Sequence, residues 1–178
     1  MKSLRSASCL LIVLAGTAAY GQSAASQATQ PYGAERSTSA KAAIERLMAE
    51  YHQAVASHDG ALLSSLFVGK GSAWFNVLSD AAFARARAKN PAASKVRLWN
   101  FRQFARVVST SHAKLDPQHA NVRILTDGTI ATVYFKYVFR IDGKAENRGS
   151  ETWQLVKASK RWKIAAITYS SNPSALGF

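Results

Sequence analysis

The sequence predicts an α+β protein in which an N-terminal helix packs against a curved sheet formed by the last third of the chain. Apolar residues recur at helical spacing between positions 40 and 57. Four runs rich in β-branched and aromatic residues follow between positions 121 and 171, separated by short turns. Each region has one apolar face, so a sheet wrapped around the helix would bury both faces at once.

The first residues are typical of an export signal. Lys2 and Arg5 precede an apolar run over 9–19, and small residues follow it. The run is shorter than the roughly 20 residues that a transmembrane helix needs. We therefore expect a signal peptide over 1–21, an exported protein in the periplasm or secreted, and no transmembrane span after its removal. A retained membrane anchor is the alternative. The single cysteine, Cys9, lies in this leader, so disulfides and cysteine-based metal sites are not expected.

The next region predicts a flexible linker and then the domain's first helix. Residues 22–39 are rich in Ser, Ala, Gln and Thr. Thr38 or Ser39 can cap a helix that ends near Ser57. Its apolar stripe consists of Ile44, Leu47, Met48, Tyr51 and Val55. The domain is expected over 40–172, with a C-terminal tail over 173–178.

The middle of the chain alternates helix and strand signals. Asp59 can cap a short second helix, and residues 73–78 have strand-like composition. Ser79 or Asp80 can cap a third helix over 81–89, which ends before Pro91. Residues 96–107 fit either a helix or the start of a strand. Residues 115–120 are expected to form a turn into the sheet.

Four antiparallel strands are expected over 121–125, 130–141, 151–157 and 162–170. In the second strand the odd positions from Ala131 to Phe139 are nearly all apolar, so that side should face the core. In the last strand, strict alternation places Trp162 and Thr168 on one face and Ile167 and Tyr169 on the other.

This order of elements resembles the NTF2-like α+β cone, and more narrowly its SnoaL-like and DUF4440-type bacterial members. The likeness covers about residues 40–171. It is carried by Asp59-x-x-x-Leu63, Leu66-Phe67, Asn121-Val122-x-Ile124, Asp127-Gly128-x-Ile130-Ala131, Phe135-x-Tyr137-x-Phe139, Gly143-Lys144, Gly149-x-Glu151-x-Trp153-x-Leu155-Val156-Lys157, Trp162-Lys163-Ile164 and Tyr169-Ser170. The resemblance implies a pocket between sheet and helices, and a homodimer joined through the outer sheet face. It implies no single activity, because the fold hosts isomerases, cyclases, dehydratases and non-catalytic binding domains.

Alternation places several polar and aromatic residues in that pocket. The ligand-binding candidates are Tyr51, Trp74, Tyr137, Glu151, Trp153 and Thr168. Glu151 is also a candidate general base, because desolvation raises a carboxyl pKa. Tyr137 could donate a hydrogen bond to an oxyanion. The alternatives are a solvated Glu151 at the rim, paired with Arg148, and a Tyr137 that only packs in the core.

Other chemistry finds little support in the sequence. Several SnoaL-like relatives carry a histidine on the last strand where this chain has Thr168, which argues against that acid–base mechanism. His52 and His58 are six residues apart, which does not suit a metal site on one helix face. The sequence contains no phosphate-binding loop, dinucleotide fingerprint or zinc-protease motif, so we expect no cofactor and no metal.

The chain carries a formal net charge of +13, and residues 81–115 contain no Asp or Glu. The cations in that stretch are Arg85, Arg87, Lys89, Lys95, Arg97, Arg102, Arg106 and Lys114. A solvated basic face is the simplest interpretation. Nucleic acid is not an expected partner of an exported protein, and anionic lipid or an envelope polymer is the better polyanion.

Three functions remain from the sequence. The first is non-catalytic binding of a small apolar or amphipathic ligand, or of a partner, in the cone. The second is a cofactor-free isomerase, cyclase or dehydratase that uses Glu151 and Tyr137. The third is a dimeric envelope interaction module with a basic face, joined through Tyr134, Val138, Ile167 and Tyr169.

Overall fold

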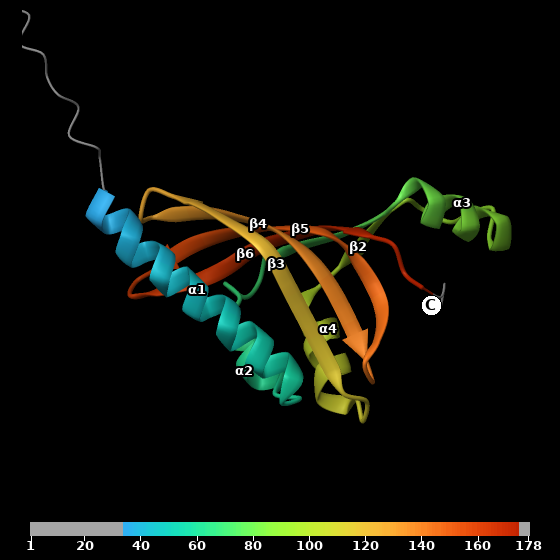
Figure 1. Cartoon of the computed structure of the whole chain (residues 1–178), viewed down its shortest axis with the longest axis horizontal. Helices are drawn as coiled ribbons and strands as arrows, with labels where there is room; N and C mark the ends of the chain where they lie inside the picture. The colour runs from blue at the N-terminus through green and yellow to red at the C-terminus, as the bar shows by residue number, and fades with distance from the viewer. Residues whose placement is uncertain (1–33, 175–178) are drawn as a thin grey trace, which may run out of the picture. The chain divides into compact units, whose positions relative to one another are not determined.

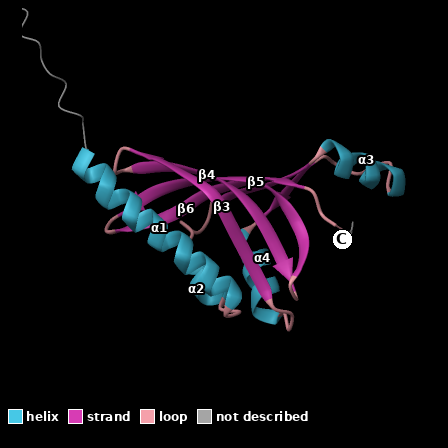
Figure 2. Ribbon diagram, viewed as in Figure 1, coloured by secondary structure: helices cyan, strands magenta, loops and turns pink. Residues whose placement is uncertain are grey.

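The computed structural model describes residues 34–174, and side chains from Thr38 onward. Figures 1 and 2 show its helices and strands. In chain order these are α1 (Ala34–Ala56), α2 (Gly60–Ser65), β1 (Ala73–Leu78), α3 (Asp80–Lys89), β2 (Val96–Trp99), α4 (Phe101–Thr110), β3 (Leu115–Thr126), β4 (Ile130–Ile141), β5 (Lys144–Ala158) and β6 (Arg161–Ser171). The predicted signal peptide, residues 22–33 and residues 175–178 lie outside the described residues.

The six strands form one mixed sheet in the order β2-β1-β6-β5-β4-β3. Neighbouring strands from β3 to β6 pair antiparallel, which confirms the prediction for the last third of the chain. β1 pairs in parallel with β6, and β2 extends the sheet antiparallel to β1. The sheet therefore contains the four strands expected in the last third of the chain, the short strand expected over 73–78, and β2.

Three helices lie on one side of this sheet, and α3 lies apart from them (Figure 1). The stripe of α1 contacts the inner sheet face through Tyr51, whose ring centroid is 4.9 Å from that of Trp153. Trp153 in turn meets Phe135 edge-on at 5.3 Å, and both side chains are fully buried. This confirms the predicted packing of the helix stripe against the odd-numbered face of β4.

Short polar side chains cap the helices as their sequence positions suggest. The Asp59 carboxylate accepts a hydrogen bond from the Leu62 N–H at the start of α2. Ser79 accepts from the Ala82 N–H at the start of α3, and Asn100 accepts from the Gln103 N–H at the start of α4. These caps fix where the short helices begin. α4 packs against the sheet through Phe104, whose ring meets that of Phe139 on β4 edge-on at 6.2 Å.

Several predicted boundaries are wrong. α1 begins at Ala34, so the expected cap at Thr38 or Ser39 and the linker's end at 39 do not match the structure. The ambiguous region over 96–107 divides into β2 and α4. β3 starts at Leu115, where a turn was expected. Pro117 lies within β3. An edge strand can contain a proline, because some of its N–H groups need no partner in the sheet.

One inserted residue in β6 reverses the predicted facing of its second half. Gln154 pairs with Ala166, but the next residue of β5 pairs with Ile164, so Ala165 forms a bulge. Beyond the bulge, Ile167 is fully buried and Thr168 is exposed. Because a shift of one residue exchanges the two faces, the pocket assignment of Thr168 is wrong. Ile167 and the partly buried Tyr169 likewise do not lie on the outer face proposed for a dimer.

Tyr134 and Val138 do lie on the outer face of β4, as predicted. The Tyr134 hydroxyl hydrogen-bonds to Ser150 at 3.1 Å, and Lys136 also donates to Ser150. This part of the outer face is polar, and the homodimer stays a prediction.

Candidate functional site

A cavity of about 220 Å³ lies between the inner face of the sheet and α1 and α4. We call it the interior cavity. Its apolar wall comes from α4, from the β1–β2 end of the sheet and from β3 and β4. This wall includes Trp74, Trp99, Phe104, Val107, Pro117 and Phe139. Its polar wall includes Tyr51, His119, Tyr137, Asn147, Glu151 and Tyr169. Trp99 and Val107 are also partly exposed, so we place the cavity's entrance between β2 and α4.

Among the described residues, Glu151 is the one carboxyl group that lines the interior cavity. It is buried on β5, and one of its carboxyl oxygens accepts a 2.6 Å hydrogen bond from the indole N–H of Trp153. Burial raises the pKa of Glu151 from an ordinary value near 4.5 to about 7, and the Trp153 hydrogen bond opposes that rise. The side chain is therefore roughly half ionised near neutral pH.

The alternative of a solvated Glu151 paired with Arg148 is wrong. Glu151 is buried, and no ion pair to it exists in the described part of the chain. Arg148 is exposed and lines a separate hollow together with Arg85. The second carboxyl oxygen of Glu151 has no hydrogen-bond partner within residues 38–174, so it can receive a polar group of a ligand.

Three tyrosines surround this carboxyl group, and they differ in what their hydroxyls already bind. The Tyr137 hydroxyl donates to the backbone carbonyl of Ser170 at 3.0 Å. Tyr169 is held near Asn76, and burial followed by the charge of Glu151 raises its pKa to about 12. Burial and then the charge of Glu151 also raise the pKa of Tyr51 well above its ordinary value. All three stay protonated near neutral pH, and each can donate a hydrogen bond.

Tyr51 has the uncommitted hydroxyl of the three. Within the described side chains it makes ring contacts to Trp153, Phe104 and His119, but its hydroxyl has no hydrogen-bond partner. Tyr137, which the sequence analysis favoured as a donor, would have to release the Ser170 carbonyl before it could bind a ligand. Of the two hydroxyls, that of Tyr51 is therefore the one that is free to donate a hydrogen bond.

The structure brings together four of the six ligand-binding candidates. Tyr51, Trp74, Tyr137 and Glu151 all line the interior cavity. Trp153 is fully buried behind this wall. It does not line the cavity, but its indole N–H donates a hydrogen bond to Glu151, which does. Thr168 is the sixth candidate, and it lies on the opposite face of the sheet.

Sequence reasoning missed His119 and Tyr169. His119 lies on β3, in the segment expected to be a turn, so no face was assigned to it. Its ring centroid is 4.4 Å from that of Phe135. Burial, and secondarily the charge of His52, lowers its pKa to about 4, so His119 is neutral near pH 7. Tyr169 was missed because the bulge at Ala165 leaves no mark in the alternation of the sequence.

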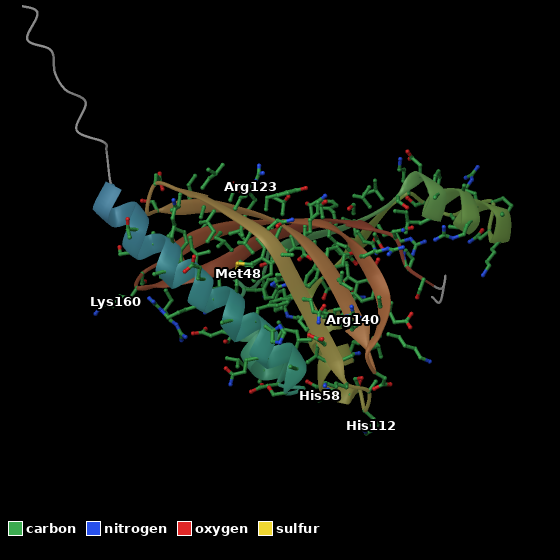
Figure 3. The ribbon with its side chains drawn as sticks, in the orientation of Figure 1. Met48, His58, His112, Arg123, Arg140 and Lys160 are labelled. Atoms are coloured by element: carbon green, nitrogen blue, oxygen red, sulfur yellow. The ribbon has the colours of Figure 1, made fainter. Side chains whose placement is uncertain are left out.

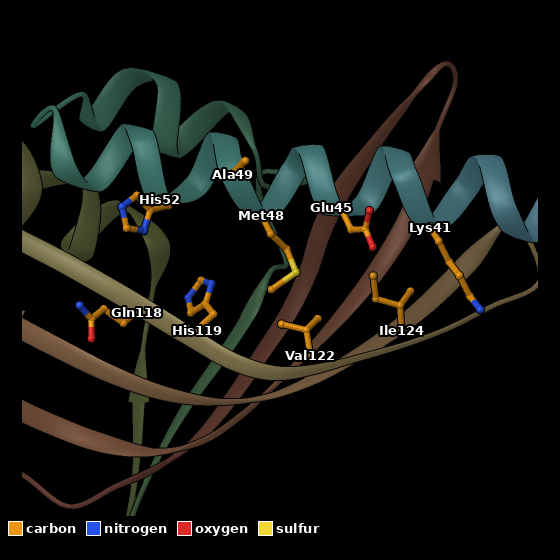
Figure 4. A pocket seen from close by; sticks show the side chains of 9 residues that line it. All are labelled: Lys41, Glu45, Met48, Ala49, His52, Gln118, His119, Val122 and Ile124. Atoms are coloured by element: carbon orange, nitrogen blue, oxygen red, sulfur yellow. The ribbon is translucent and has the colours of Figure 1, made fainter.

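His119 also lines a second, wider hollow between α1 and β3, which we call the outer groove (Figure 4). It measures about 740 Å³ and is open to solvent. Met48, Val122 and Ile124 form its apolar part, while Lys41, Glu45 and His52 form its polar part. The Nδ1–H of His52 donates to the Pro117 carbonyl at 2.8 Å, which fixes its tautomer. Glu45 and Lys41 face solvent here, so the groove lacks the desolvated carboxyl group of the interior cavity.

The remaining histidines are remote from this site. His58 ends the α1 turn with a positive φ of 59° and hydrogen-bonds to the Val108 carbonyl, while His112 is exposed. Figure 3 shows both at the far end of α1 and α4. Within residues 38–174, no group of three or more His, Cys, Asp or Glu side chains is placed to hold a metal ion.

Comparison with solved structures identifies the architecture. The chain matches an NTF2-like protein of unknown function from Shewanella baltica with a TM-score of 0.53 and 16% identity, over 77% of this chain and 97% of the other. It matches a candidate scytalone dehydratase from Novosphingobium aromaticivorans with a TM-score of 0.59 and 15% identity, over 78% and 87%. It also matches the β subunit of a candidate aromatic-ring-hydroxylating dioxygenase from the same organism, with a TM-score of 0.59 and 13% identity over 79% and 94%.

The sequence itself gives no comparable match. No protein-family model matches it, and no curated protein matches it at a significant level. This chain has a helix followed by a curved, unclosed six-stranded sheet, and the solved structures that it matches include NTF2-like proteins. This chain therefore has the NTF2-like α+β cone fold.

Proposed function

We propose that the protein binds a small, mostly apolar ligand with one polar group in the interior cavity. The observation that supports this most is the pairing of an aromatic wall with uncommitted polar groups. They include the free carboxyl oxygen of Glu151, the hydroxyl of Tyr51 and the indole N–H of Trp74. Cavities that are largely apolar, with a few fixed polar groups, are the usual sites for small molecules.

The size of the cavity limits the ligand. Its volume of about 220 Å³ lies below the range of roughly 300–1,000 Å³ that is usual for drug-sized ligands. A compound of one or two rings fits this space. Glu151 in its protonated form can donate to a hydroxyl or carbonyl oxygen, and in its ionised form it can accept from a phenol.

Filling the cavity's entrance tests the proposal. We expect Val107→Trp to weaken binding of 1-naphthol at least about tenfold, because the larger side chain takes up space that the ligand needs. Val107 is 48% exposed, so the change should leave the fold intact. Val68→Trp is the matched control, because Val68 is 42% exposed and does not line the interior cavity. Isothermal titration calorimetry measures both affinities.

Two results would contradict the proposal. The first is no binding of 1-naphthol, naphthalene or phenol by the natural sequence at millimolar ligand. The second is equal affinity for the Val107→Trp and Val68→Trp variants, which would place the ligand elsewhere on the molecule.

A second candidate function is a cofactor-free reaction that moves a proton. It is favoured by one observation, the buried Glu151 with a pKa of about 7, which suits a general base. In this candidate Glu151 takes a proton from carbon next to a carbonyl group, and Tyr51 donates a hydrogen bond to the oxygen that becomes negative. The carboxyl proton then returns to carbon or to a neighbouring position.

Exchange of hydrogen for deuterium separates the two candidates. An enzyme of this type would speed the exchange of α-protons of 1-indanone in D₂O, and Glu151→Gln would slow that exchange at least about a hundredfold. A binding protein would leave the exchange rate at that of buffer. NMR spectroscopy of the ketone follows the reaction.

A further inference from the structure

We propose that the ligand of the interior cavity carries a carbonyl oxygen as a second polar group, and that the indole N–H of Trp74 donates a hydrogen bond to it. This inference rests on the binding function proposed above and adds the chemical class of the ligand. Trp74 lies on β1 and lines the interior cavity. It is only 7% exposed, and its indole N–H has no hydrogen-bond partner within the described part of the chain.

An unpaired donor of this kind is uncommon inside a protein. Nearly all buried polar groups bind another protein atom or an ordered water, because an N–H that leaves water without finding a partner costs free energy. The rings packed on Trp74 supply no oxygen, since Phe67 stacks on it at 5.7 Å and Phe104 meets it edge-on at 5.5 Å. The backbone of β1 is already paired with β2 on one side and β6 on the other. A ligand atom in the cavity can supply the missing acceptor.

The surroundings of Trp74 favour a neutral carbonyl group over other acceptors. A hydroxyl would bring a proton of its own, for which Phe67 and Phe104 offer no acceptor. The amide oxygen of Asn76 is also unpartnered, but Asn76 does not line the interior cavity. A carboxylate is a poor match, because no Lys or Arg among the described residues lines the cavity and the ionised form of Glu151 would repel it.

The strand order places this donor apart from Glu151. Trp74 pairs with Ile167 on β6, and Ile167 pairs with Trp153 on β5. Two strand spacings, about 10 Å in all, therefore separate the backbones of β1 and β5. Glu151 lies two residues along β5 from Trp153. A ligand that binds both groups has its two oxygens at opposite ends of a ring, which is the arrangement of a para-hydroxyphenyl ketone.

Isothermal titration calorimetry with two matched phenols tests the proposal. 4′-Hydroxyacetophenone carries the carbonyl group, and 4-isopropylphenol has nearly the same shape without it. Trp74→Phe removes the indole N–H and keeps an aromatic ring. We expect this change to lower the affinity for 4′-hydroxyacetophenone about tenfold relative to the affinity for 4-isopropylphenol, the size of effect expected when one hydrogen bond is lost and its acceptor stays buried.

Two further variants separate the hydrogen bond from the shape of the cavity. Trp99→Phe is the matched control, because Trp99 pairs with Trp74 across the strands and lines the same cavity, but is 39% exposed. It should leave the ratio of the two affinities unchanged. Incorporation of 3-benzothienylalanine at position 74 keeps both rings and replaces the N–H with sulfur. It should reproduce the loss seen with Trp74→Phe, and it serves as the test if that variant does not fold.

NMR spectroscopy gives a readout at the donor itself. The indole N–H signal of Trp74, identified by its absence from either Trp74 variant, should move downfield when 4′-hydroxyacetophenone binds. It should not do so with 4-isopropylphenol.

Three outcomes would overturn the inference. If both phenols bind and the affinity ratio is the same with and without the Trp74 N–H, an ordered water pairs with this group, and the binding function stands without the carbonyl. If Trp99→Phe changes the ratio as much as Trp74→Phe, the preference comes from the shape of the cavity. If the natural sequence binds neither phenol, the binding function itself is wrong, and this inference is wrong with it.

Discussion

Replacing Glu151 with Gln is expected to stabilise the protein by about 3 kcal/mol at pH 7 and above. Burial raises the pKa of this carboxyl group to about 7. In the unfolded chain the same group ionises near its ordinary value of 4.5. Folding must therefore keep a proton on Glu151 or bury its charge, and each pKa unit of difference corresponds to about 1.4 kcal/mol. Glutamine has nearly the same shape, carries no charge, and can still accept from the Trp153 N–H.

The pH range of the effect follows from the direction of the shift. A carboxyl group whose pKa is higher in the folded protein contributes its full stability below the unfolded value, near pH 4.5. That stability is lost as the pH rises to the folded value of about 7, and it does not change further above it. The stability difference between Glu151→Gln and the natural sequence should therefore grow between pH 4.5 and 7 and then level off.

Urea unfolding at a series of pH values measures this difference. Glu45→Gln is the control, because it makes the same substitution at a glutamate that is exposed on α1. Parallel stability curves for Glu151→Gln and the natural sequence would mean that Glu151 ionises at its ordinary pKa in the folded protein. In that case neither the binding role nor the proton-transfer role of Glu151 would retain its physical basis.

The features of this fold that sequence analysis predicted correctly are local ones. Asp127-Gly128 and Asp142-Gly143 define tight turns, and both glycines have a positive φ, which glycine adopts at no steric cost. The strand between these turns has the predicted bounds, Ile130–Ile141. Its alternation was enough to predict which side of β4 is buried, and therefore that the stripe of α1 would contact it.

The features that were missed depend on contacts between distant segments. β3 begins at Leu115, although Pro117 made a turn the better prediction, because an edge strand tolerates a residue without N–H. The bulge at Ala165 lies in a run of two alanines, so the sequence gives no sign of which residue is inserted. The parallel pairing of β1 with β6 joins residues about ninety positions apart, which no local pattern encodes.

In the candidate site, too, residues that depend on local patterns were predicted correctly and residues that depend on distant contacts were not. Glu151 and Tyr51 were placed correctly because no bulge interrupts the alternation of β5 at Glu151 or the helical spacing of α1 at Tyr51. Thr168 was misplaced and Tyr169 missed because both follow the bulge. The hydrogen bond from Tyr137 to the Ser170 backbone could not be predicted either, because it depends on how closely β6 approaches β5 near Gly149. A side chain at Gly149 would bring Cβ to 2.0 Å from the Ser170 carbonyl oxygen, so only glycine permits that approach.

Replacing Trp153 with Ala is expected to destabilise the protein by about 3–5 kcal/mol, the usual range for loss of a large buried aromatic side chain. Trp153 is fully buried and contacts Tyr51, Phe135 and His119, so the deletion leaves a void at the point where α1, β3, β4 and β5 meet. Urea unfolding at pH 5, where Glu151 is mostly protonated, measures the packing effect with little contribution from the charge.

Two further variants separate the contributions to this loss of stability. One replaces a different tryptophan, and the other removes only the indole N–H of Trp153. Trp99→Ala should cost less than about 1 kcal/mol, because Trp99 is 39% exposed at the cavity's entrance. Trp153→Phe keeps most of the ring but removes the N–H that binds Glu151. That hydrogen bond lowers the pKa of Glu151, so its loss should raise this pKa further and make the variant's stability fall more steeply as pH increases. A Trp153→Phe variant with the same pH dependence as the natural sequence would show that the indole N–H does not control the ionisation of Glu151, and that Trp153 serves the site by packing alone.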